Sequence, residues 1–180
     1  MTPAGTRVAY TITYLGMRED PGLAEPQFPA GCRLEEAVAP PVWYFLSLYS
    51  AVGKAYAWQD RLEEPEDDVA AFIGNPDVEL WTLSGGGWPK GFFVLDFREP
   101  ARCDLAYFGL VPEAVGRGLG RPLLQAAIAK GWARPSTGWM TVNTCTLDHP
   151  RALGLYQSMG FRKRYTQDHN RVLTHDHHAG

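Results

Sequence analysis

The sequence predicts a single α/β (α+β) domain. Three segments between Val78 and Val111 carry the β-branched and aromatic residues typical of strands, and the short turns between them indicate an antiparallel meander. Helix-like segments precede the meander, and beyond it helices and strands alternate. The 180 residues fit one hydrophobic core, and no internal repeat or linker divides them. We therefore treat residues 1–180 as one domain.

The first part of the chain predicts one strand, a long loop and two helices. Arg7–Met17 is rich in Val, Ile, Thr and Tyr and alternates in part, so we expect a strand. Arg18–Cys32 contains proline and glycine throughout and should form a surface loop. Pro40–Gly53 begins with proline and ends on glycine, as a short helix does. Glu64–Pro76 repeats that pattern, with acidic residues in its first turn.

The rest of the chain predicts mainly strands, joined by two helices. One helix follows a glycine-rich loop and runs to about Arg134. The other covers Asp148–Gly160, with Asp148 as its N-cap, Pro150 in its first turn and Gly160 as its stop. We expect strands at Val78–Ser84, Gly91–Arg98, Arg102–Val111, Gly138–Leu147 and Phe161–Gln167, with a last one at Asn170–His175.

Composition and charge exclude several classes of protein. The hydrophobic fraction of 45% and the charged fraction of 21% are ordinary for a globular domain. The net charge of -3, without a basic block, disfavours a nucleic-acid partner. No segment approaches the roughly 20 apolar residues that span a bilayer, so we expect no membrane partner. The N-terminal segment has no signal-peptide core, so we expect a cytoplasmic protein.

Cysteines and histidines give no strong metal signal. Cys32, Cys103 and Cys145 are odd in number and widely spaced, which argues against disulfides and zinc pairs and favours reduced thiols. The tail "THDHHAG" brings together three histidines that could bind a metal, although a frayed polar terminus explains it as well. These histidines are His175, His177 and His178. We expect no metal cofactor.

The glycine-rich segment "AVGRGLGRPLL" has the features of an anion-binding loop. Gly116, Gly118 and Gly120 let the backbone turn tightly and approach a ligand closely. A helix follows, so free N–H groups and the positive end of its dipole lie at the loop, with Arg117 and Arg121 beside them. The spacing matches neither the dinucleotide fingerprint nor the P-loop. A turn that binds nothing remains the alternative.

Two segments together resemble the GCN5-related N-acetyltransferases, the GNAT superfamily. The segment "YFGLVPEAVGRGLGRPLLQAAI" is similar to the family's strand, R/Q-x-x-G-x-G/A loop and helix. The segment "DHPRALGLYQSMGFR" is similar to its N-x-x-A-x-x-x-Y-x-x-x-G-F helix and following strand. One strand separates the two, as in the family. The resemblance covers about Val78 to Arg164, and the chain departs from it at Val115, in the R/Q position, and at His149, in the Asn position.

The resemblance implies a mixed, mostly antiparallel central sheet flanked by helices on both faces, and acetyl-CoA as the donor. It divides the chain into a helical acceptor-side region (17–76), an acetyl-CoA-binding core (78–166) and a C-terminal segment (167–180). The pyrophosphate would lie on the glycine loop and the pantetheine arm along the strand before it. The implied acetyl-CoA-binding residues are Leu110, Val111, Gly116, Arg117, Gly118, Leu119, Gly120, Arg121, His149 and Tyr156. An amide near Val111 would polarise the thioester carbonyl.

Acetyl transfer needs a proton donor for the leaving thiolate and a way to deprotonate the amine. By resemblance, Tyr156 is the expected acid, since a phenol can protonate a thiolate in a dry site; a packing role is the alternative. Asp104 falls where the histone-acetylating branch of the family has its glutamate and is the expected base. An exposed structural carboxylate is the alternative for Asp104, and Asp96 or a water relay could replace it.

The acceptor is expected to lie against the aromatic segment "VWYFLSLYSAVGKAYAWQDRL". Trp43, Tyr49 and Trp58 could form the walls of an amine pocket, although such residues can also simply be core. Arg61 could bind an acceptor carboxylate, or pair with Asp60, Glu63 or Glu64. We expect an N-acetyltransferase that acts on a small-molecule amine or amino-acid-like acceptor by direct attack in a ternary complex. A protein or peptide N-acetyltransferase and a non-catalytic acyl-CoA-binding module are the alternatives, and a homodimer stays open because the family includes them.

Overall fold

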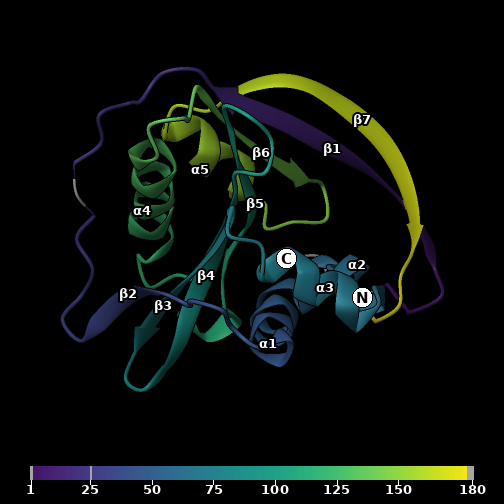
Figure 1. Ribbon diagram of the computed structural model, residues 1–180. Coiled ribbons are helices and arrows are strands. Elements are labelled where there is room, and N and C mark those ends of the chain that lie inside the picture. Colours follow the sequence, from purple (N-terminus) through teal and green to yellow (C-terminus); the bar gives the residue numbers. More distant parts are fainter. Residues whose placement is uncertain (1, 25, 178–180) are drawn as a thin grey trace.

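In the computed structural model, which describes residues 2–24 and 26–177, seven strands form one sheet in the order β2-β3-β4-β5-β6-β1-β7 (Figure 1). Neighbouring strands are antiparallel except β5 and β6, which run parallel. This confirms the predicted mixed, mostly antiparallel sheet. The strands are β1 (Arg7–Met17), β2 (Cys32–Glu36), β3 (Val78–Gly85), β4 (Trp88–Asp96), β5 (Arg102–Leu110), β6 (Trp139–Cys145) and β7 (Arg162–Val172).

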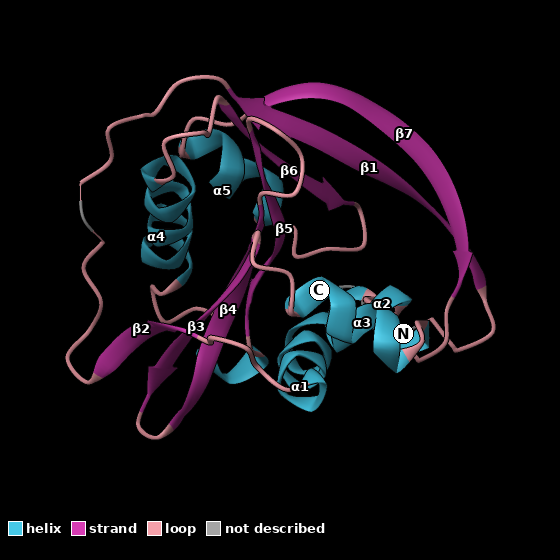
Figure 2. Ribbon diagram, viewed as in Figure 1, coloured by secondary structure: helices cyan, strands magenta, loops and turns pink. Residues whose placement is uncertain are grey.

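Helices cover both faces of the sheet (Figure 2). On one face, Gly131 of α4 packs against Met140 and Cys103 so closely that an added Cβ would lie 2.4 Å from Met140. On the other face, α1 approaches β5, and Val52 lies over Gly109. The α-helices are α1 (Val42–Gly53), α2 (Asp60–Glu63), α3 (Glu66–Ile73), α4 (Gly120–Ala133) and α5 (Ala152–Ser158), and 3-10 turns occupy Lys54–Tyr56 and Pro112–Ala114.

The core fills the space between the sheet and its helices. Its largest fully buried side chains include Phe45 of α1, the β4 pair Phe92 and Phe93, and Leu123 and Leu124 of α4. The adjacent phenylalanines point to opposite faces of β4, so each helical layer packs on one of them. None of the helices in the described ranges has the length and apolar character needed to cross a membrane.

The structure corrects four details of the sequence prediction. Strand β2 was missed; it is a short edge strand in which only Cys32 and Leu34 are partly buried. Strand β4 begins at Trp88, inside the predicted turn. Helix α5 begins at Ala152, so Asp148 does not cap it. The two predicted C-terminal strands are one continuous strand, because β7 pairs with β1 along its whole length.

The N-terminal strand lies inside the sheet. β1 pairs with β6 on one side and with β7 on the other, from Arg7↔Val172 to Gly16↔Arg162. Beyond these strands, Thr2 and His177 exchange two backbone hydrogen bonds of 2.7 and 2.8 Å. The tail is therefore paired with the N-terminal segment as far as His177, and His178 lies outside the described residues.

Candidate active site

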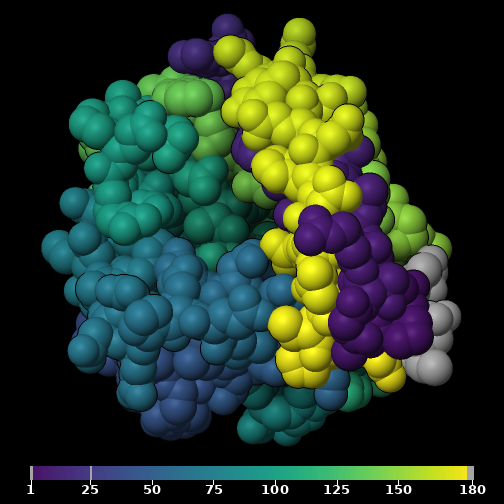
Figure 3. Space-filling model, turned by 90° about the vertical axis from the view of Figure 1, so that its right-hand side faces the viewer, coloured from purple at the N-terminus to yellow at the C-terminus, as the bar shows by residue number. Residues whose placement is uncertain are grey.

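The parallel strands β5 and β6 separate in the middle of the sheet. Their pairing runs from Arg102↔Trp139 to Leu105↔Val142, and a bulge opposite Val94 and Leu95 then redirects β5. Beyond this point a cavity of about 580 Å³ opens, lined by β5 from Leu105 to Leu110, the glycine loop, α5, β6, β1 and the segment before α2. Figure 3 shows the surface hollowed between the helical region and the β1–β7 pair.

Alternate backbone amides of β5 face the cavity. The Val111 amide donates to the Lys90 carbonyl oxygen at 3.0 Å, and is therefore used within the sheet. Because antiparallel residues alternate between neighbours, the amides of Phe108 and Leu110 point away from β4, toward the opening. The direction of the Leu110 amide is therefore compatible with the expected contact to a pantetheine arm. The amide expected near Val111 can be that of Leu110, whereas Val111 itself does not fit, because its N–H already has a partner and its side chain does not line the cavity.

The glycine loop forms one end of the cavity. Gly116 and Gly118 have φ values of +79° and +75°, which favour glycine, and an added Cβ at either would meet no atom within 4 Å. With Leu119, Gly120 and Arg121 they line the cavity where α4 begins. Arg121 donates to Ser158 Oγ at 3.4 Å. The exposed Arg117 is not part of the lining, and Val115 is.

Tyr156 of α5 lines the cavity. Its side chain is buried, with edge-to-face contacts to Phe108 and Phe161. Burial raises the pKa of Tyr156 well above its usual range, and the negative charge of Asp148 adds to this effect. The phenol is therefore protonated at neutral pH, the state that a proton donor requires.

The structure does not bring Asp104 into the cavity. Asp104 lies at the start of β5, where the Thr141 hydroxyl donates to it, and it does not line the cavity. Burial raises its pKa, which the Thr141 hydrogen bond and Arg102 oppose. The reserve candidate, Asp96, faces Asp104 across the β4–β5 pair. Burial would raise the pKa of Asp96, but hydrogen bonds from Arg98 outweigh it and lower the pKa.

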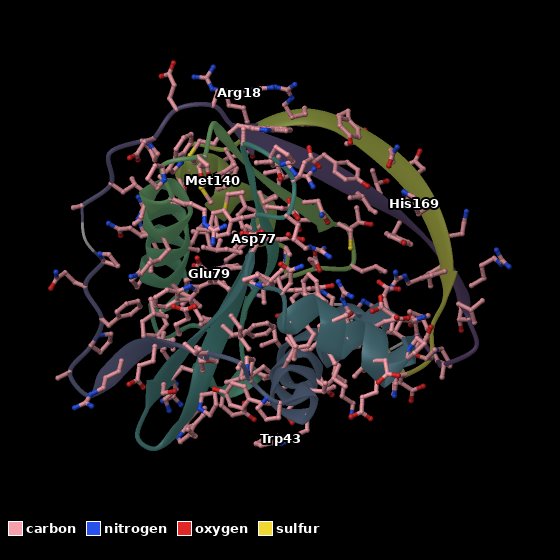
Figure 4. All side chains as sticks on the ribbon, in the orientation of Figure 1. Arg18, Trp43, Asp77, Glu79, Met140 and His169 are labelled. Carbon is pink, nitrogen blue, oxygen red and sulfur yellow. The ribbon has the colours of Figure 1, made fainter. Side chains whose placement is uncertain are left out.

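The predicted acceptor residues separate into two groups. Tyr49 and Trp58 line the cavity, with ring centroids 5.3 Å apart. Trp43 is 67% exposed at the outer edge of the molecule, away from the cavity (Figure 4). Arg61 lies behind the aromatic wall: it forms an ion pair with Glu64 at 2.6 Å and donates to the Tyr107 hydroxyl at 2.8 Å. The ion-pair alternative for Arg61 is thus the one observed.

Several cavity residues escaped the sequence prediction. Tyr10 of β1 and Arg171 of β7 lie on one wall, and Arg171 donates to Asp60 at 3.1 Å and to the Ala57 carbonyl oxygen at 2.7 Å. Asp148 also lines the cavity, although the sequence suggested a helix cap. Tyr10 and Arg171 could have been recognised from the sequence only if the pairing of β1 with β7 had been known.

His149 reaches the cavity by a local turn. Its Nδ1 accepts a hydrogen bond from the Arg151 amide at 3.1 Å, and its ring lies 6.2 Å from that of Tyr56. Nδ1 is thereby used within the turn before α5, which leaves Nε2 for other contacts. Within residues 2–24 and 26–177, no three His, Cys, Asp or Glu side chains are grouped as a metal would need.

A comparison with protein families decides the relationship. The profile of the acetyltransferase (GNAT) family matches residues 45–161, well over half of the chain. The chain belongs to this family. The matched region includes the glycine loop, Tyr156 and the aromatic cavity residues Tyr49, Trp58 and Tyr107. A search of curated protein sequences gives no match.

Solved GNAT structures share the fold at low sequence identity. A GCN5-related N-acetyltransferase from Kribbella flavida is 16% identical with a TM-score of 0.60, and the match covers 89% of this chain and 56% of that one. A tandem GNAT protein from the clavulanic acid biosynthesis pathway is 18% identical (TM-score 0.66; 95% and 55%). An aminoglycoside acetyltransferase from an uncultured soil metagenomic sample, in complex with sisomicin, is 10% identical (TM-score 0.57; 72% and 87%). The chain thus spans little more than half the length of the first two.

Proposed function

We propose that this GNAT protein is an acetyl-CoA-dependent N-acetyltransferase with a small-molecule or amino-acid-like amine as acceptor. One observation carries the proposal: a single cavity connects the glycine loop, the separated edge of β5, Tyr156 and an aromatic chamber. These are the parts that a ternary complex of donor and acceptor needs.

The residues present fit acetyl-CoA, which supplies an activated acetyl thioester when bound. Gly116 and Gly118 leave open space above a helix N-terminus, which suits a pyrophosphate. The outward-facing backbone of Phe108 and Leu110 suits the amides of a pantetheine arm. His149 Nε2 is available for a further hydrogen bond. Residues 78–166 would then form the donor-binding core, and residues 17–76 most of the acceptor side.

Two groups of this chain would act on the reacting atoms. The outward amides of β5 donate to the oxygen on which negative charge develops during attack. Tyr156 donates its proton to the departing thiolate. Since Asp104 lies away from the cavity, water carries the proton from the amine. No enzyme nucleophile is required for direct attack.

A small acceptor is favoured by the aromatic chamber, whose rings pack against one another. The ring centroid of Tyr107 lies 5.4 Å from that of Tyr49 and 5.8 Å from that of Trp58, which gives a rigid wall rather than an open polar groove. The similar fold bound to sisomicin is that of an enzyme whose acceptor is a small molecule. A peptide acceptor remains the second candidate.

The test is a screen of amines and short peptides that follows free-thiol release from acetyl-CoA. We expect turnover with at least one small amine, and turnover lower by about 10²- to 10⁴-fold after Tyr156→Phe at the same enzyme concentration. Acetyl-CoA should also raise the melting temperature. Absence of this thermal shift would contradict the proposal, and turnover with peptides alone would favour the second candidate. Coenzyme binding without any turnover would indicate a binding module.

A further inference from the structure

Asp148 holds together three segments of the cavity wall. Its Oδ2 accepts hydrogen bonds from the Thr144 hydroxyl and the Cys145 amide, both at 2.8 Å. Its Oδ1 accepts one from the indole Nε1 of Trp58 at 3.1 Å. A carboxylate can accept about four hydrogen bonds, so one position on Oδ1 remains. Because Asp148 lines the cavity, that position is available to a ligand.

The Asp148 charge acts at the centre of the site. It contributes to the raised pKa values of Tyr156, Tyr56 and Cys145, all of which line the cavity. In the described part of the chain, Asp148 takes part in no ion pair. The other carboxylate of the lining, Asp60, already has Arg171 as its partner at 3.1 Å.

The other charged side chains of the lining lie near the glycine loop and α5 or are paired with each other. Arg121 and Arg151 lie toward the glycine loop and α5, where a phosphate group would be bound. Asp60 and Arg171 form an ion pair, which leaves Asp148 as the carboxylate of the lining without a cationic partner in the described part of the chain. A partly buried carboxylate without a cation is unfavourable, and a cationic ligand would relieve that cost.

Aromatic rings surround the same position. Asp148 accepts the indole N–H of Trp58, whose ring centroid lies 5.8 Å from that of Tyr107. The ring of Tyr56 lies against that of His149. Arg61 fixes the Tyr107 hydroxyl from behind. Aromatic faces around one carboxylate attract an ammonium group by cation–π interaction and exclude neutral polar competitors.

We infer that Asp148 binds the acceptor amine in its ammonium form, so that the enzyme selects aliphatic primary amines that are cationic at neutral pH. The inference rests on the proposed function and adds to it the substrate class and the residue that selects it. Asp148 then takes the place that the sequence suggested for Asp104, as the carboxylate beside the reacting amine. It acts by binding and orienting, and the deprotonation stays with water.

The experiment compares two probes of equal shape, butylammonium and n-butanol, on the protein saturated with CoA, which cannot react. Binding is measured at pH 7 by ligand-observed NMR. We expect the wild type to bind butylammonium at least tenfold more tightly than butanol, and Asp148→Asn to lose this preference. Asp68→Asn on the exposed start of α3 removes the same charge away from the cavity and should keep the preference.

Two results would overturn the inference. One is a wild-type preference below threefold; the other is an unchanged preference in Asp148→Asn. The wild-type result does not depend on how any variant folds. For Asp148→Asn, the melting temperature shows whether the variant is folded. CoA affinity, measured separately, distinguishes failure of the proposed function from failure of the inference about Asp148. If the protein does not bind CoA, the proposed function is contradicted. If it binds CoA but shows no preference for the ammonium ion, only the role of Asp148 is contradicted.

Discussion

Val52 of α1 packs directly on the backbone of Gly109 in β5. A Cβ added at Gly109 would lie 2.3 Å from Val52 Cγ1, a distance that real carbon atoms do not adopt. This contact sets how closely α1 approaches the strand that lines the cavity. The missing side chain is therefore part of the packing between α1 and the sheet.

Gly109→Ala should destabilise the protein, because the new methyl group forces α1 away from β5. We expect a loss of about 1–3 kcal/mol in the free energy of unfolding, measured by urea denaturation. Val52→Ala removes the opposing methyl groups, so the double variant should be more stable than the sum of the two single changes predicts. Strict additivity would show that the two residues do not contact each other.

Gly118→Glu should abolish coenzyme binding by placing a carboxylate where the pyrophosphate is proposed to lie. Gly87, in the β3–β4 turn, is a matched control: its φ is +84° against +75°, and neither position has an atom within 4 Å of an added Cβ. Gly87→Glu should thus cost similar stability and leave affinity unchanged. Calorimetric titration with CoA measures both, and we expect at least a tenfold difference. Equal CoA affinities of the two variants would show that the pyrophosphate does not lie on this loop.

Tyr156→Phe should lower kcat by about 10²- to 10⁴-fold, the usual contribution of a general acid, with CoA affinity within twofold of the wild type. Because burial and Asp148 raise the pKa of Tyr156, the phenol keeps its proton well above pH 10. The wild-type kcat should therefore not fall between pH 8 and pH 10. A decline in that range would mean that a different group is the acid.

Cys145 should react slowly with alkylating reagents. Burial, assisted by the charge of Asp148, raises the pKa of its thiol to about 11, so the protonated, unreactive form dominates at neutral pH. Relative to a free thiol, the thiolate fraction at pH 7 is about two orders of magnitude smaller. The rate should rise tenfold per pH unit up to about pH 11. Mass spectrometry after iodoacetamide treatment measures it, and CoA should slow the reaction further because Cys145 lines the cavity.

Local signals predicted most of the fold. The meander from Val78 to Leu110 follows from alternation and short turns, and Gly160 ends α5 with a φ of +107°. Strand β2 was missed because an edge strand with two partly buried side chains has almost no hydrophobic pattern. The glycine loop and Tyr156 line the cavity and could be proposed because each belongs to a continuous segment, the loop with its own anion-binding pattern and Tyr156 within the segment that resembles the family.

The acceptor side could be predicted only in part, because it depends on contacts between distant residues. Asp148 has the sequence position of a helix cap, and only the fold brings Trp58 to it from 90 residues away. Arg61 and Arg171 carry the same charge, yet one lies behind the wall and the other lines the cavity. For Val111, the sequence cannot tell which amides of β5 face β4, since that is set by register.

The position of β1 has a consequence for synthesis on the ribosome. Both of its neighbours, β6 and β7, are synthesised long after it. Both edges of β1 therefore stay unpaired while the chain grows. The segment from β3 to α4 can assemble meanwhile, since β3, β4, β5 and α4 are consecutive in sequence. Tyr10 and Arg171 meet only when β7 emerges. A chain cut short before β7 would therefore lack the part of the cavity wall that Arg171 contributes.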